Sequence, residues 1–142
     1  MNRLAEILEE KGGDVLEIDA DASVLEAVGQ MVENNVGSLL VTERGDVTGI
    51  VTERDYLRRV TLEGRTEESP VREIMSTPLI VASIDTTIDE CMALMTDRRI
   101  RHVPVMDDDK VVGMVSIGDL VKFQSRQQTF EIQYLTQYIT TG

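Results

Sequence analysis

The sequence predicts an α/β (α+β) fold made of two tandem copies of one strand–helix–strand–strand–helix unit. One short stretch occurs twice, as Gly-Ile-Val-Thr-Glu-Arg-Asp at 49–55 and as Gly-Met-Val-Ser-Ile-Gly-Asp at 113–119, so the offset is 113 − 49 = 64 positions. Residues 21–57 align without a gap on residues 85–121, which indicates an internal duplication. Eight residues of the first copy recur unchanged 64 positions later: Asp21, Glu26, Met31, Val41, Val47, Gly49, Val51 and Asp55.

Each element of the first copy follows from periodicity and capping signals. Apolar residues at helical spacing predict an amphipathic helix over 3–11, which Gly12-Gly13 ends. Ser23 is a good N-cap for a second helix, with Glu26 at the capping-box position. Apolar runs predict strands at 15–18, 39–41 and 47–51, with a turn at 44–46. Thr52 then caps a helix that runs to about Leu62, and a brief helix over 70–75 ends before Thr77-Pro78.

These signals divide the chain into five segments. They are an N-terminal helix (1–13), a first βαββα repeat (14–63), a linker (64–76), a second repeat (77–123) and a long C-terminal helix (124–142). Two halves of this size bury little core alone, so we expect them to pack on each other with pseudo-two-fold symmetry. Phe130, Tyr134 and Tyr138 recur every four residues in the last segment, where they would contact a partner subunit or pack on their own domain.

Composition narrows the class of protein. The net charge of −12 argues against nucleic-acid and anionic-membrane partners, which require a basic surface. A single cysteine and a single histidine argue against a metal site within the chain. No apolar run reaches the roughly 20 residues that span a bilayer, and the charged N-terminus does not resemble a signal peptide. We therefore expect a cytoplasmic protein in a reducing compartment.

The two strand-to-helix junctions are the candidate sites. Thr52-x-x-Asp55 and Ser116-x-x-Asp119 fit capping boxes, which need no ligand. The alternative is a binding site, since a carboxylate there can accept hydrogen bonds from vicinal sugar hydroxyls, and anions favour the helix N-terminus. Gly49 and Gly113, in the preceding strands, favour close backbone approach. Two basic clusters could pair with phosphate: Arg54, Arg58 and Arg59, and Arg98, Arg99, Arg101 and His102. The combination predicts a nucleotide-binding site, although the P-loop and Gly-x-Gly-x-x-Gly motifs are absent.

Taken together, these motifs resemble a tandem cystathionine-β-synthase (CBS) domain pair, or Bateman module, of the stand-alone bacterial or archaeal type. The resemblance covers about residues 14–123 and also rests on Arg-His-Val-Pro-Val at 101–105 and Ile-Asp-Thr-Thr-Ile-Asp-Glu at 84–90. It implies a non-enzymatic homodimer that binds AMP, ADP, ATP or NAD(H) in clefts between the repeats. No cofactor is required, and the output goes to an unidentified regulated protein.

The resemblance also implies a role for each site residue. Asp55 and Asp119 would hold ribose hydroxyls, and Thr52 and Ser116 would bond sugar or phosphate. The main chain at Leu16 to Ile18 and at Ile80 to Ala82 would read adenine, while Val103 and Pro104 pack on its ring. Gly37, Ser38 and Leu39 are the first-repeat counterparts of Arg101, His102 and Val103, so the two sites are not equivalent. Phosphate pairing would be stronger at the second site unless Lys11 and Arg54 compensate at the first, and Thr77 completes the set of residues that line the ligand.

Two other functions remain open at this stage. A small enzyme acting on a nucleotide would use His102, Cys91 or the aspartates, but the sequence shows no nucleophile–base pairing. A DNA-associated regulator is disfavoured by the negative charge. Cys91 lies on an apolar helical stripe and is expected in the core, and His102 is either a phosphate contact or an ordinary surface residue.

Overall fold

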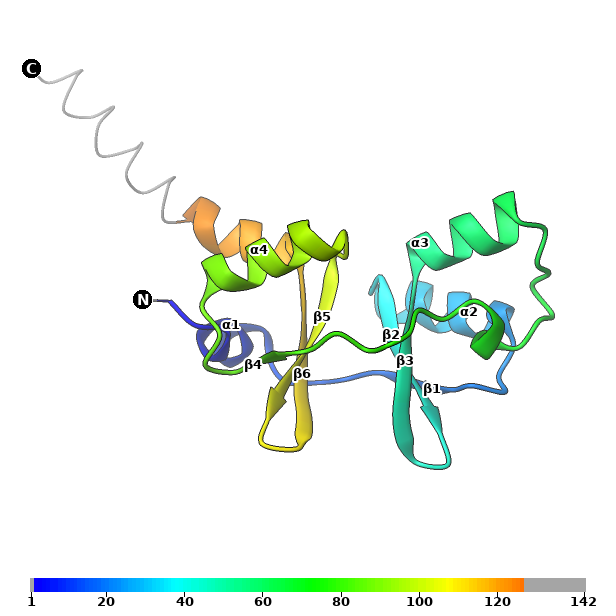
Figure 1. The fold of residues 1–142 in the computed structure, drawn as a ribbon, viewed down its shortest axis with the longest axis horizontal. Coiled ribbons are helices and arrows are strands. Elements are labelled where there is room, and N and C mark those ends of the chain that lie inside the picture. The colour runs from blue at the N-terminus through cyan, green and yellow to red at the C-terminus, as the bar shows by residue number, and fades with distance from the viewer. Residues whose placement is uncertain (1, 127–142) are drawn as a thin grey trace, which may run out of the picture. The chain divides into compact units, whose positions relative to one another are not determined.

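The computed structural model describes residues 2–126, and each copy of the duplicated pattern forms its own compact unit (Figure 1). The first unit comprises residues 14–81. The second unit comprises residues 82–126 together with residues 2–13, so the N-terminal helix belongs to the second copy. The predicted α/β fold with two βαββα repeats is confirmed. The aromatic stripe at Phe130, Tyr134 and Tyr138 lies outside the described residues.

The first unit is a three-stranded mixed sheet with its helices. Its elements are β1 (Glu17–Asp19), α2 (Val24–Asn34), β2 (Ser38–Glu43), β3 (Asp46–Thr52), α3 (Glu53–Tyr56), the π-helical continuation of α3 (Leu57–Leu62) and a 3-10 turn (Val71–Glu73). The sheet order is β1-β2-β3, with β1 parallel and β3 antiparallel to β2. The β2–β3 hairpin turns through Arg44 and Gly45, both at positive φ.

The second unit repeats this topology. Its elements are α1 (Leu4–Lys11), β4 (Ala82–Ser83), α4 (Ile88–Arg98), β5 (His102–Asp107), β6 (Lys110–Ser116) and a helix at 117–126. β4 runs parallel to β5, and β6 runs antiparallel to it (Figure 1). The register shifts between Val105 and Met106, 64 residues after the equivalent shift between Val41 and Thr42. The duplication therefore extends to the detail of strand pairing.

Local signals account for the helix boundaries. Ser23 accepts a hydrogen bond from the Glu26 amide at 3.1 Å and caps α2, and Thr87 caps α4 in a reciprocal box with Glu90. The helices end at left-handed residues, Asn35 and Arg99. The strand boundaries differ from expectation by one or two residues. The largest shift at a strand start is in β1, which begins at Glu17, where the parallel ladder with β2 starts, rather than at Val15.

Each unit has its own apolar core. In the first unit, the core consists of apolar residues of the sheet and of α2 together with Val71 and Ile74. In the second, Leu4 and Ile7 of α1 are buried against β4, β5, β6 and α4. Burial of Val71 and Ile74 holds the segment beside the junction of β3 and α3, and burial of Leu4 and Ile7 holds α1 beside the junction of β6 and the helix at 117–126. No helix within residues 2–126 is long and apolar enough to cross a membrane.

Candidate functional site

Both strand-to-helix junctions are closed by reciprocal capping boxes. In the first unit, the Asp55 amide donates to Thr52 Oγ1 at 3.1 Å, and Asp55 Oδ2 accepts from the Thr52 amide at 3.0 Å. In the second, the Asp119 amide donates to Ser116 Oγ at 3.1 Å, and Asp119 Oδ2 accepts from the Ser116 amide at 2.8 Å. The capping prediction is confirmed, and each box holds its carboxylate at the start of a helix.

The first amide of each helix is also occupied. The Glu53 amide donates to the Gly37 carbonyl at 3.1 Å, and the Ile117 amide donates to the Arg101 carbonyl at 2.8 Å. Two of the first three helical amides at each junction are thus bonded within the chain. An anion would find fewer donors here than the sequence suggested, so the side chains rather than the helix N-terminus must supply most of any binding.

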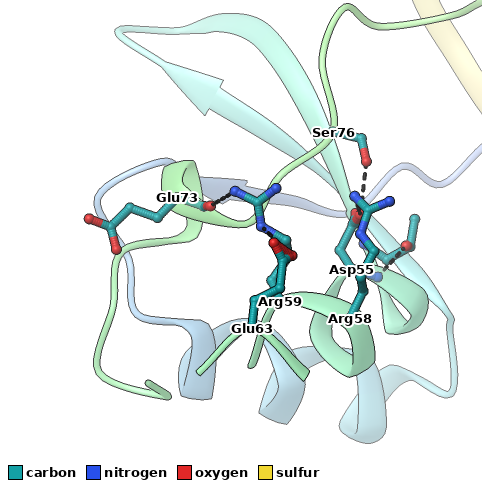
Figure 2. A network of polar contacts seen from close by, with 7 residues as sticks. Asp55, Arg58, Arg59, Glu63, Glu73 and Ser76 are labelled. Atoms are coloured by element: carbon teal, nitrogen blue, oxygen red, sulfur yellow. Dashed lines mark hydrogen bonds and ion pairs between the residues drawn. The ribbon is translucent and has the colours of Figure 1, made fainter. Parts of the chain in front are cut away.

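The Asp55 carboxylate is enclosed. Its side chain is 6% exposed, and Oδ1 accepts a hydrogen bond from Ser76 Oγ at 2.8 Å (Figure 2). Arg58 lies 3.9 Å from the same oxygen. Because Oδ2 is bonded to Thr52, both oxygens already have partners in the first unit.

Main-chain bonds hold Ser76 over Asp55. The Ser76 amide donates to the Ile50 carbonyl at 2.8 Å, and the Ile50 amide donates to the Ser76 carbonyl at 3.2 Å. Just before this segment, Arg59 donates to the Glu73 carbonyl at 2.8 Å, so the π-helical stretch is tied to the 3-10 turn (Figure 2). A sugar hydroxyl could reach Asp55 only if Ser76 turned away.

The Asp119 carboxylate is more accessible and has a different partner. Its side chain is 26% exposed, and Oδ2 lies 2.7 Å from Lys11 Nζ at the end of α1. The expectation that Lys11 adds charge at the first site is therefore wrong, because α1 packs in the second unit. The ammonium also donates to the Met114 carbonyl at 2.7 Å. Burial opposes ionisation of Asp119, but the bonds from Lys11 and Ser116 outweigh it and keep its pKa below the ordinary value. Asp119 is therefore an ionised carboxylate near the surface.

The structure brings some of the other predicted residues to the junctions. Ser38 pairs with Thr52 across the β2–β3 ladder, and His102 pairs with Ser116 across β5–β6. Arg101 is exposed and directly precedes β5. Ser38 and His102 therefore lie opposite the two capping residues, and the Arg101 carbonyl is bonded to the first helical amide.

Others lie in positions that limit their roles. Leu39 and Val103 are fully buried in the cores of their units, main chain included, and Pro104 is buried as well. Ile18 is buried in β1, and the Leu16 carbonyl accepts a bond from the Leu40 amide. Three further members of the set lie at or near the surface, Arg54 and Thr77 exposed and Ile80 half-buried.

The chain itself approaches the two repeated glycines. A Cβ at Gly49 would lie 2.9 Å from the Ser76 carbonyl oxygen and 3.0 Å from Met75 Sδ. A Cβ at Gly113 would lie 2.4 Å from a methyl carbon of Leu8. The expected close approach is present, but at each glycine it serves packing of the bordering segment, so neither glycine indicates a ligand.

Two contributors were missed from the sequence. Ser76 lies 21 positions from Asp55, and the Met114 carbonyl lies 103 positions from Lys11. A hydroxyl in a linker and a carbonyl in a strand carry no pattern that spacing could reveal. Only the packing of the bordering segments brings them to the site.

Cys91 and His102, which the sequence offers as candidates for catalysis, lie in different elements of the second unit. Cys91 is fully buried in α4, and burial raises its pKa to about 11, so its thiol is unreactive at neutral pH. His102 is half-buried at the start of β5. Within residues 2–126, no three side chains of His, Cys, Asp and Glu are grouped to hold a metal ion.

Comparison with known proteins gives the family. Residues 5–61 and 71–126 each match the CBS domain, so the chain belongs to the CBS domain family as a tandem pair. It is 40% identical over 149 aligned positions to the mitochondrial CBS domain-containing protein CBSX3 of Arabidopsis thaliana, covering 98% of this chain and 72% of that protein.

Solved structures agree with this assignment. A protein with CBS domains from Burkholderia ambifaria is 42% identical, with a TM-score of 0.82 over 85% of this chain and 92% of that one. The CBS domain pair of protein MJ0100, solved in complex with 5-methylthioadenosine and S-adenosyl-L-methionine, is 25% identical, with a TM-score of 0.75 over 86% of this chain and 98% of that one.

Proposed function

We propose that this CBS domain pair is a non-catalytic regulatory module that binds an adenosine-containing nucleotide at the Ser116–Asp119 junction. The observation that carries the proposal is the state of Asp119: an ionised, partly exposed carboxylate beside a hydroxyl at the start of a helix. Such a carboxylate can accept hydrogen bonds from both hydroxyls of a ribose. Charge-assisted hydrogen bonds of this kind are roughly twice as strong as neutral ones.

Positive charge for the ligand's phosphates is available in the same unit. Arg101 is exposed, and its carbonyl is fixed to the Ile117 amide at the start of the helix. His102 pairs with Ser116 across the β5–β6 ladder, so it lies at the same junction. The first unit has Gly37 and Ser38 at these two positions, so it lacks these two side chains. We therefore expect AMP, ADP, ATP or NAD(H) to prefer the second unit.

The comparisons support an adenosine ligand in particular. Both ligands named for the MJ0100 domain pair contain adenosine, and that pair shares the fold of this chain. The enclosure of Asp55 supports a difference in ligand affinity between the two junctions, because a ligand at the first junction must first displace Ser76. The first junction would therefore bind adenosine ligands more weakly or not at all.

Isothermal titration with AMP, ATP, NADH and S-adenosylmethionine tests the proposal. We expect Asp119→Asn to weaken nucleotide binding about tenfold or more, because it removes the charge on the acceptor. Asp109→Asn, which removes one exposed acid from the β5–β6 turn, is the matched control and should bind as the wild type does. Equal affinities for wild type and Asp119→Asn would refute the assignment, and release of a product from any nucleotide would favour an enzyme.

A second copy of the chain is the expected partner. The surface groove between α2 and α3 is lined partly by Val32 and Leu57, whose exposed fractions are 75% and 59%. Burial of such side chains in a homodimer would remove apolar surface from water. Light scattering of Leu57→Asp against the wild type tests this, and a monomeric wild type would contradict it. The regulated protein would then be sought by its nucleotide-dependent binding to that dimer.

A further inference from the structure

Lys11 occupies one oxygen of the Asp119 carboxylate that the proposed ligand would use. Its ammonium lies 2.7 Å from both Asp119 Oδ2 and the Met114 carbonyl oxygen, and its side chain is 38% exposed. The segment that borders the first junction, residues 64–81, contains no lysine. The contact is therefore a feature of the second unit.

The backbone at Lys11 is held independently of this ion pair. Leu4 and Ile7 are buried in the core of the second unit, and the amides of Leu4 and Ala5 donate to the carbonyls of Thr86 and Ile84. Lys11 is the last residue of α1, so its side chain leaves a fixed helix end. The ammonium can change partner by rotation of a flexible side chain while α1 stays in place.

We propose that Lys11 is a specificity-determining residue that exchanges Asp119 for an anionic group of the ligand. The inference rests on the proposed function. An incoming ribose displaces the ammonium from Asp119, and a phosphate on the same ligand then accepts it. A neutral nucleoside also displaces the ammonium but provides no new anion. The site therefore discriminates against adenosine and in favour of adenosine phosphates.

Electrostatic arguments predict opposite changes in the affinities for adenosine and for AMP when Lys11 is removed. Removal of the ammonium frees the carboxylate, so a neutral sugar no longer competes with an internal cation. The same removal takes away a charge-assisted bond to phosphate. Loss of Lys11 should therefore strengthen adenosine binding and weaken AMP binding, whereas a purely structural role would shift both in one direction.

The experiment is titration of adenosine and AMP into the wild type, Lys11→Met and Lys11→Arg. Methionine keeps the length of the apolar stem, and Lys110→Met, at an exposed position of β6, is the matched control. We expect adenosine to bind Lys11→Met roughly two- to fivefold more tightly than wild type, as for loss of a partly exposed ion pair. AMP should bind it roughly tenfold more weakly, and Lys11→Arg should keep the preference for AMP.

The outcomes separate the two proposals. If AMP binds the wild type but adenosine binds Lys11→Met no better than wild type, the exchange is wrong and the binding site stands. If neither ligand nor any other adenosine nucleotide binds the wild type or Lys11→Met, the proposed function fails and the exchange fails with it. Thermal unfolding of Lys11→Met beside Lys110→Met verifies that both variants are folded.

Discussion

Ser76 Oγ donates a 2.8 Å hydrogen bond to Asp55 Oδ1, and this bond closes one of two otherwise matching junctions. The equivalent carboxylate, Asp119, makes the same capping box but has Lys11 as its further partner. A neutral hydroxyl completes an enclosed structural site in the first unit, whereas an ammonium on a flexible side chain covers a reachable carboxylate in the second. One duplicated motif thus has two different sets of partners.

The first prediction compares how much the Asp55 and Asp119 carboxylates contribute to the free energy of unfolding. Asp55→Ala should lower the free energy of unfolding by about 2–3 kcal/mol, because it removes the N3 half of the capping box and leaves the partly buried Ser76 hydroxyl and Thr52 amide without their acceptor. Asp119→Ala should lower it by about 1 kcal/mol, since the site is partly exposed. Urea denaturation measures both, and a larger loss for Asp119→Ala would contradict the distinction.

The second prediction concerns pH. Because the folded pKa of Asp119 is lowered, its ionisation contributes stability that is complete above the unfolded value near 4 and is lost as the pH falls through the folded pKa. The difference in unfolding free energy between the wild type and Asp119→Asn should be constant from about pH 5 to 7 and should shrink below about pH 4. Urea titrations across this range measure it, with Asp109→Asn as control for the lost charge. A difference that grew on acidification would have the wrong sign.

The third prediction concerns the repeated glycines. Gly49→Ala should cost about 2–3 kcal/mol, since its Cβ would meet the Ser76 carbonyl, which is fixed to β3. Gly113→Ala should cost less, because the atoms that it meets belong to the mobile end of Leu8, and Leu8→Ala should relieve part of that cost. Gly29→Ala in α2 is the control: nothing lies within 4 Å, and helix propensity predicts a gain of up to about 1 kcal/mol. Equal losses at Gly49 and Gly29 would refute the packing explanation.

Short-range features were predictable and long-range ones were not. Thr52 with Asp55 and Ser116 with Asp119 are three residues apart, so one turn of helix places them together and spacing was sufficient. The start of the first strand was less predictable, because strand ends depend on the partner strand rather than on local sequence.

The amino-acid sequence alone predicted the duplication, the α/β units and the capped carboxylates, because these features depend on periodicity and on bonds within a single turn. Which carboxylate is enclosed was settled by packing across the chain. Burial of Val71 and Ile74 brings Ser76 to Asp55, and burial of Leu4 and Ile7 brings Lys11 to Asp119 across 108 positions. Hydrophobic burial of the bordering segments has no signature in the motifs themselves, and it sets the difference between the two junctions.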